Sequence, residues 1–428
     1  MLGKILKSSL FKSSGIYTIT SIINASIPFL LIPVLTRVFS PEDYGIVSMA
    51  AIIINIVTPF IGVSAHGAIH RKYFEENKEL DFPRYVGNAF LLLLFSTFAL
   101  FILFLLFGNF ISNYTAVPFE WLIVILLVGV CQFVTMTLLT IWQVKVKPFK
   151  YGVLQILQSI LNAGFSLFFI YQLHYGWQSR LLGQLISVSI TALISLFLLI
   201  KLKYVKFNYN KADLKDITSF SFPLIPHILG GLLIAFTDRI LITNLISVTD
   251  TGVYTVAYQI GSVLGLVNTA FIGAYVPWLY NKLNLNDFQV KIKIVKFTYL
   301  YFLALILVVV FSVYILPLIL SFLIGKSFQS AIHYILWIIL GYAFNGMYLM
   351  VCGFIFYVKK TKLLSIVTLS TALLNIPLCY FFLKWFGTIG ASISMAIIYF
   401  ISFVATWYLS NKVYEMPWFS TKLYRNVA

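Results

Sequence analysis

The residues best suited to chemistry are the ionisable side chains that interrupt long apolar segments. Asp238 and Arg239 lie inside the apolar segment 219–245. An arginine near the centre of a membrane helix costs about 2.5–3.5 kcal/mol on insertion scales, so it usually faces a protein interior or a cavity. Arg239 is therefore a candidate contact for a phosphate or an acidic sugar. The structural alternatives are pairing with Asp238 or extension of the side chain to the outer membrane interface.

An ion-coupled step would need a group that changes its charge. Asp238 is the acidic residue placed deepest within an apolar segment. His227 precedes it by eleven residues, about three helical turns, so both are expected on one helix face. Histidine titrates near neutral pH. We therefore select Asp238 and His227 as candidates for ion coupling, with simple hydrogen bonding in the helix bundle as the alternative for the histidine.

Amide, hydroxyl and imidazole groups form a second set, spaced three or four residues apart and so expected to share helix faces. Such a face can bind the hydroxyl groups of a sugar, or it can hydrogen-bond to neighbouring helices. The two faces and a third, shorter group comprise Asn55, Thr58, Gly62 and His66; Gln155, Gln158, Asn162 and Ser166; and Gln132, Thr135 and Gln143. The selected candidates for substrate contacts are Arg239, Arg37, His66, Asn55, Gln155 and Asn162. For Arg37 the alternative is an interfacial anchor.

The composition predicts that these residues lie on membrane-spanning helices. The chain of 428 residues is 61% hydrophobic and 10% charged, whereas soluble domains carry about 25% charged residues. Its apolar blocks are long enough for helices that cross a bilayer. We expect an all-α polytopic membrane protein with short connecting segments and about twelve spans. The expected spans are 14–36, 45–67, 86–107, 119–141, 151–172, 181–201, 219–245, 252–275, 298–320, 331–355, 363–383 and 388–410.

The basic residues predict the orientation of these spans. Of the 30 Lys and Arg residues, 25 lie in the N-terminus, the even-numbered connections and the C-terminus. Four lie on the opposite side, and Arg239 lies within a span. Such a bias over short connections places both termini in the cytoplasm of a multi-pass protein. The net charge of +17 is thereby explained by topology and anionic membrane lipids, so no nucleic-acid partner is expected.

No cofactor or metal is expected. The three cysteines, Cys131, Cys352 and Cys379, all lie in apolar blocks and suggest neither a disulfide framework nor a metal site. A phosphate-binding loop of the Walker type is absent from the sequence, which argues against direct ATP hydrolysis.

A short motif recurs after the first and seventh spans. Asp43-Tyr44-Gly45 and Asp250-Thr251-Gly252 both follow a span and a short turn, and both lead into the next span at a constant offset of 207 residues. Since six spans separate the copies, both halves begin on the same side of the membrane. This predicts two six-helix lobes, 1–207 and 208–428, related by a parallel pseudo-two-fold axis. The alternative is two similar turns that arose by chance.

An ordered set of motifs along nearly the whole chain resembles the polysaccharide transporter family of the multidrug/oligosaccharidyl-lipid/polysaccharide exporter superfamily, and above all its O-antigen and capsule repeat-unit flippases (Wzx-like). The matching segments are 35–37 with 40–45, 69–77, 238–242 leading into 252–254, 277–280, and 359–362 followed by Asn375 and 387–391. The resemblance implies flipping of an undecaprenyl-diphosphate-linked oligosaccharide across a bacterial plasma membrane, by alternating access of two six-helix lobes. Implied partners are the lipid-linked oligosaccharide, membrane lipids, a polysaccharide polymerase and chain-length regulator proteins.

Three other functions are compatible with a polytopic membrane protein. A multidrug and toxin extruder needs buried carboxylates for cations, and the first half has no acid deep in any span. A membrane-embedded glycosyltransferase or polymerase usually needs a large external loop, whereas the external connections here are short. A non-transporting scaffold is opposed only by the family resemblance. We therefore expect a transporter rather than an enzyme.

Overall fold

The computed structural model describes residues 9–75, 81–285 and 287–418, and this part of the chain is built from helices without a β-strand. It divides into two compact units, residues 1–236 and 237–428. Unit 1 contains α2 (Ser9–Val38), α3 (Pro41–Val57), η1 (Ile61–Ser64), α4 (Ala65–Tyr73), α5 (Phe82–Thr115), α6 (Phe119–Val144), α7 (Pro148–Leu173), α8 (Gln178–Lys201) and α9 (Lys211–Ser221). Helix α10 (Leu224–Leu245) contains the division. Unit 2 contains α11 (Val248–Gly261), α12 (Val263–Leu283), α13 (Phe288–Leu323), η2 (Lys326–Ala331), α14 (Ile332–Tyr357), α15 (Thr361–Phe386) and α16 (Thr388–Val413).

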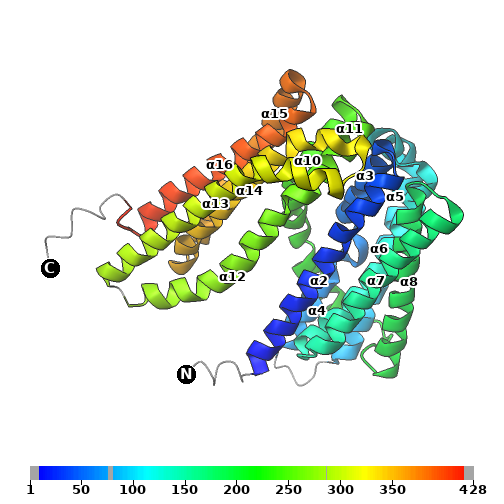
Figure 1. The fold of residues 1–428 in the computed structure, drawn as a ribbon. Helices are drawn as coiled ribbons and strands as arrows, with labels where there is room; N and C mark the ends of the chain where they lie inside the picture. Colours follow the sequence, from blue (N-terminus) through cyan, green and yellow to red (C-terminus); the bar gives the residue numbers. More distant parts are fainter. Residues whose placement is uncertain (1–8, 76–80, 286, 419–428) are drawn as a thin grey trace, which may run out of the picture. The chain divides into compact units, whose positions relative to one another are not determined.

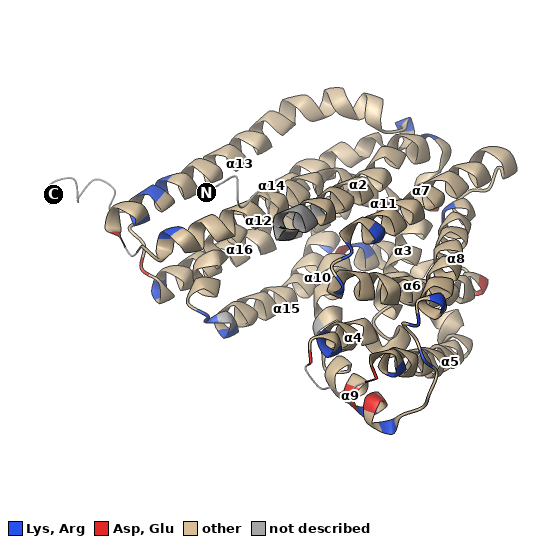
Figure 2. Cartoon of the chain, turned by 90° about the horizontal axis from the view of Figure 1, so that it is seen from below, with Lys and Arg blue, Asp and Glu red and all other residues tan. Residues whose placement is uncertain are grey.

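These helices confirm the predicted multi-pass membrane fold. Within the described ranges, ten helical segments are long and apolar enough to cross a membrane, or twelve if each of two bent pairs forms one span. Large apolar side chains remain exposed on their outer faces, as in α5, where Leu94 is 66% exposed and Phe95 is 70% exposed. Lys and Arg lie mainly at helix ends and in connecting segments (Figure 2). Both features suit helices that are surrounded by lipid.

In unit 1, helices α2, α7, α8 and α6 pack in that order, each against the next (Figure 1). Small residues allow close approach, since Gly183 of α8 leaves room for the backbone of Ser166 in α7. In unit 2, α14 packs against both α16 and α11. There, Gly265 of α12 leaves room for the ring of Tyr342. Close packing at small residues is the usual means by which membrane helices associate.

The second span is bent, which corrects the prediction of one continuous polar face from Asn55 to His66. Helix α3 and the segment Ile61–Tyr73 meet at 59°. Pro59 cannot donate a backbone hydrogen bond and its ring crowds the preceding turn, so the helix ends before it. The next turn contains three left-handed residues, with φ of 60° at Gly62, 52° at Val63 and 52° at Ser64. Asn55 and His66 therefore lie on separate helical segments.

The 207-residue repeat has a structural counterpart inside each unit. Ser40 caps α3 by accepting a hydrogen bond from the Asp43 amide at 3.1 Å, and Ser247 caps α11 through the Asp250 amide at 3.0 Å. Each aspartate also accepts a hydrogen bond at the start of a later helix in its own unit. Asp43 accepts from the amide of Trp177, before α8, and Asp250 accepts from the hydroxyl of Thr388 in α16. The repeated motif thus performs the same packing role twice.

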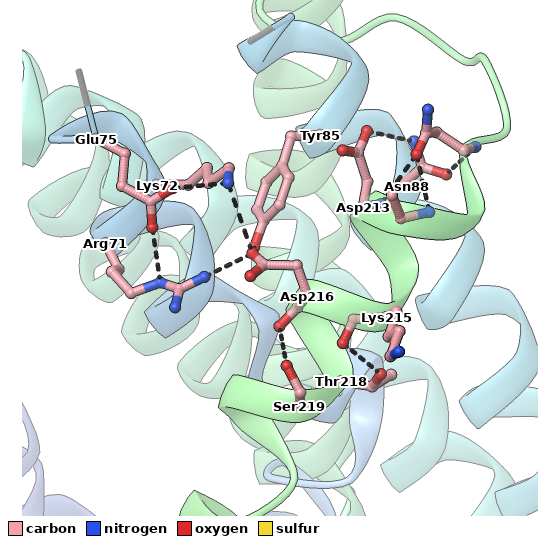
Figure 3. A network of polar contacts seen from close by, with 12 residues as sticks. Arg71, Lys72, Glu75, Tyr85, Asn88, Asp213, Lys215, Asp216, Thr218 and Ser219 are labelled. Carbon is pink, nitrogen blue, oxygen red and sulfur yellow. Dashed lines mark hydrogen bonds and ion pairs between the residues drawn. The ribbon is translucent and has the colours of Figure 1, made fainter. Parts of the chain in front are cut away.

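Helix α9 belongs to unit 1, where polar contacts join it to α4 and α5 (Figure 3). Asp216 pairs with Arg71 of α4 and accepts a hydrogen bond from the hydroxyl of Tyr85 at 2.7 Å. One turn earlier, Asp213 pairs with Arg84 of α5 at 2.9 Å. These contacts tie α9 to the distal end of the bent second span. The predicted lobe boundary at residue 207 stays a prediction.

The contacts of Asp216 yield a stability prediction. Asp216→Asn should lower the free energy of unfolding by about 1–3 kcal/mol, because it replaces a charged acceptor shared by Arg71 and the buried Tyr85. Asp81→Asn is the matched control. Lys206 donates to Asp81 and holds the pKa of that carboxyl below its usual range, but the lysine side chain is 61% exposed. That variant should change stability by less than about 1 kcal/mol. Thermal unfolding of the purified protein in detergent compares the two, and equal effects would contradict a special role for Asp216.

Candidate functional site

Two adjoining cavities in unit 1 form a polar groove along α4, α6 and α7. Their volumes are about 240 and 220 Å³, and they share His66 and Met136. We define the polar groove by its polar lining residues, which are Thr58, His66, His70, Gln132, Thr135, Thr140, Gln143, Tyr151, Gln155 and Gln158. Among the described residues that line these two cavities, none is Asp, Glu, Lys or Arg. The groove therefore offers hydrogen-bonding groups with little fixed charge.

The bend of the second span places His66 in the groove. His66 lies in the first turn of α4, two residues after the left-handed Ser64. The amide of Gly62 donates to the hydroxyl of Ser96 in α5 at 2.8 Å, which holds the bend against a neighbouring helix. On the other side, a Cβ at Gly62 would overlap the ring of Phe133 in α6. The bend is thus fixed from both sides, and its backbone strain is typical of functional sites.

The polar side chains of the groove fall into two groups. Gln155 is part of the packing between helices, since it accepts from Asn24 of α2 at 3.0 Å and donates to the hydroxyl of Tyr151 at 3.2 Å. By contrast, four other side chains make no side-chain hydrogen bond to any described residue, namely His66, Gln132, Gln143 and Gln158. Gln143 is exposed, and His66, Gln132 and Gln158 are half-buried. These four groups are therefore available to water or to a ligand.

Three of the predicted contacts lie outside the lining of the groove. Asn55 is exposed and donates to the carbonyl of Ala51 at 2.7 Å. Asn162 accepts from Arg180 of α8 at 3.3 Å, so it contributes to packing between α7 and α8. Arg37, at the end of α2, is exposed and donates to the carbonyl of Pro33 at 2.7 Å. Of the six selected substrate contacts, His66 and Gln155 are the two that lie in the groove.

Unit 2 encloses the charged pair that the sequence analysis singled out. Arg239 is 5% exposed, and its guanidinium carbon lies 3.8 Å from the centre of the Tyr258 ring. Asp238 is 8% exposed and accepts from the hydroxyl of Tyr254 at 2.7 Å. The hydroxyl of Tyr342 in turn donates to that of Tyr258 at 2.9 Å. Arg239 is therefore held inside unit 2 against an aromatic face and near the charge of Asp238, rather than extended to the membrane interface.

The candidates for ion coupling have different outcomes. Asp238 lies in the buried cluster just described. The side chain of His227 lies outside the described residues. Sequence reasoning missed the three tyrosines of the cluster, Tyr254, Tyr258 and Tyr342, and also Tyr151 of the groove. Tyrosine occurs 26 times in the chain, so its presence within an apolar segment did not distinguish these positions.

Comparisons with known proteins place this geometry in context. The model of a family described as Polysaccharide biosynthesis protein matches residues 10–281, and that of a family named MatE matches residues 223–381. A protein of Haemophilus influenzae named "Lsg locus putative protein 1" is 25% identical over 92% of this chain and 98% of its own length. A Shigella flexneri protein named "Putative O-antigen transporter" is 24% identical over 92% of this chain and 94% of its own.

Solved structures show the same fold. The lipid II flippase MurJ in an inward closed conformation superposes with a TM-score of 0.72 at 17% identity, over 93% of this chain and 87% of that one. A multidrug resistance transporter of the MATE family in an inward-facing conformation gives a TM-score of 0.69 at 16% identity, over 92% and 94% of the two chains. At these identities the likeness concerns the fold alone.

Proposed function

Because the chain belongs to the polysaccharide biosynthesis protein family, we propose that it is a flippase that moves an undecaprenyl-diphosphate-linked oligosaccharide repeat unit across the bacterial plasma membrane. The product would serve the assembly of a surface polysaccharide such as O-antigen or capsule. Transport would proceed by alternating access, with both termini in the cytoplasm. A polysaccharide polymerase and chain-length regulator proteins would be the downstream partners.

The polar groove of unit 1 is the observation that carries this proposal. A sugar headgroup has many hydroxyl groups, and removing each from water without a replacement hydrogen bond costs about 2–7 kcal/mol. The groove replaces those bonds with the free side chains of Gln132, Gln143 and Gln158, and with His66. Amides both donate and accept hydrogen bonds, as sugar hydroxyls do. The groove therefore suits a neutral, hydroxyl-rich headgroup.

Arg239 supplies the positive charge that a diphosphate needs. Guanidinium groups bind phosphate oxygens in a bidentate manner, and in a low-dielectric interior that contact is strong. The ring of Tyr258 fixes the orientation of the guanidinium, and Asp238 balances its charge when no phosphate is bound. We propose that a phosphate replaces part of the interaction with Asp238 during transport. In the same proposal Asp238 and His227 respond to the coupling ion.

A cation-coupled multidrug exporter is the second candidate, since the MatE model matches residues 223–381. A cationic drug would need a carboxylate in its binding site. In the part of the chain that the structure describes, no acidic residue lines the polar groove, and Asp238 accepts a hydrogen bond from Tyr254. These observations favour the saccharide substrate. A membrane-embedded glycosyltransferase or polymerase is a third candidate. Deletion of the gene distinguishes it from a flippase.

Deletion of the gene tests the proposed function. We expect loss of surface polysaccharide and accumulation of lipid-linked single repeat units on the cytoplasmic side of the membrane, because synthesis continues while translocation stops. Extraction and mass spectrometry of the lipid-linked intermediates measure this accumulation. Loss of a polymerase would instead leave single repeat units on the cell surface. Loss of a drug exporter would change antibiotic sensitivity and leave the polysaccharide unchanged.

A further inference from the structure

A second pocket, distinct from the polar groove, opens at one end of unit 1. It lies where α4, α6 and α8 end and α5 begins, and its volume is about 390 Å³. We call it the lysine pocket, and its lining consists of Lys72, Tyr73, Glu75, Phe82, Pro83, Lys145, Leu202, Lys203 and Tyr204. It shares no lining residue with the polar groove. The transport proposal therefore does not account for it.

Positive charge exceeds negative charge in this pocket. Three lysines line it, namely Lys72 in the last turn of α4, Lys145 after α6 and Lys203 after α8, and among the described lining residues Glu75 is the one acid. Glu75 is already paired with Lys72 at 2.7 Å and with Arg71 at 3.4 Å. Within the described residues, Lys145 and Lys203 have no carboxylate within 4.0 Å. Among the residues that the structure describes, these two ammonium groups in the lining of a preformed cavity therefore have no acidic partner.

Tyr204 contacts two ammonium groups, that of Lys145 in the pocket lining and that of Lys147 beside it. The Nζ atom of Lys145 lies 4.0 Å from the centre of the Tyr204 ring. On the same residue, Lys147 donates to the tyrosine hydroxyl at 3.3 Å. Cation–π contacts hold a lysine in place without neutralising it. The geometry therefore presents oriented positive charge to an anion rather than dispersing it into water.

The rest of the lining indicates which anion fits. Phe82, Pro83 and Leu202 form an apolar wall beside the lysines. The pocket lies at the ends of helices that are long and apolar enough to cross a membrane, and the headgroups of a bilayer lie at the ends of such helices. Basic pockets between membrane helices bind phosphate headgroups. We propose that the lysine pocket binds the phosphate of an anionic membrane lipid, with the adjoining glycerol and acyl carbons against the apolar wall.

The test measures lipid binding to the full-length protein in detergent by native mass spectrometry. The probes are phosphatidylglycerol, zwitterionic phosphatidylcholine and inorganic phosphate. Lys145→Gln/Lys203→Gln should weaken binding of phosphatidylglycerol about 30-fold, since each lysine near a membrane surface contributes about a fivefold effect. The matched control is Lys291→Gln/Lys293→Gln in unit 2, where Lys291 lies 4.7 Å from the Tyr414 ring. The control should leave phosphatidylglycerol binding within about twofold of the parent.

Each outcome decides the proposal. The proposal is supported if the parent protein binds phosphatidylglycerol more tightly than phosphatidylcholine, and if the pocket variant loses this preference while the control variant keeps it. Equal binding of the two lipids, or equal loss in both variants, overturns it. If millimolar inorganic phosphate displaced bound phosphatidylglycerol as effectively as added lipid does, the pocket would be a site for free phosphate, and the lipid assignment would be overturned. Lys203→Gln alone, with the Lys145–Tyr204 contact intact, should give about a fivefold loss and guards against a folding defect in the double variant.

Discussion

Arg239→Ala is expected to abolish export of lipid-linked repeat units and to destabilise unit 2. Asp238 is 8% exposed. The substitution removes the positive charge that lies near its carboxylate. A buried carboxylate that loses its compensating positive charge destabilises the fold by about 3–5 kcal/mol. Thermal unfolding in detergent measures the stability, and the quantity of surface polysaccharide in cells measures export. Loss of export in this variant alone would not separate folding from phosphate binding.

A second variant separates these two effects. Asp238→Asn/Arg239→Gln removes both charges, so no uncompensated charge stays buried, and the Asn side chain can still accept from Tyr254. We expect its stability to recover to within about 1.5 kcal/mol of the parent protein, while export remains absent. Recovery of export together with stability would show that the charged pair is structural, and it would remove Arg239 from the proposed phosphate site.

Much of the fold follows from hydropathy and charge, because a bilayer forces the backbone into helices. Helix ends were less predictable. The span predicted at 86–107 extends over Phe82–Thr115 in α5. Hydropathy marks the apolar centre of a helix, whereas the end is set by capping groups, here the Asp81 side chain and Pro83 in the first turn. The aspartate and proline were visible in the sequence as a helix-start signal.

The candidate site was predictable only in part, because helical periodicity describes one helix at a time. It selected His66 and Gln155, which line the polar groove, and their contact with a substrate stays a prediction. It failed for Asn55, since Pro59 ends α3 and the following segment turns by 59°. The tyrosines around Arg239 come from α11 and α14, which are far apart in sequence. Their meeting depends on tertiary packing, which no local pattern encodes.

The bend itself provides the second prediction with a large effect, the loss of export in Gly62→Ala. Alanine at φ 60° carries a left-handed penalty of about 1–2 kcal/mol. Its Cβ would also overlap the ring of Phe133, and such overpacking costs about 1–3 kcal/mol more. Because Phe133 lines the polar groove, a displaced ring would enter the space proposed for the sugar. We therefore expect both a lower unfolding temperature and loss of surface polysaccharide.

Gly67→Ala is the matched control on the same span. A Cβ at Gly67 meets Phe220 at 3.6 Å and Leu224 at 3.8 Å, which are ordinary contacts, and Gly67 has no left-handed φ. This variant should export normally and gain or lose less than about 1 kcal/mol of stability. If Gly62→Ala exported as well as Gly67→Ala, the bend would not determine the shape of the groove. The double variant Gly62→Ala/Phe133→Leu separates the two causes. If it regained export while its stability stayed low, the overlap with the Phe133 ring would limit transport, and the backbone strain would not.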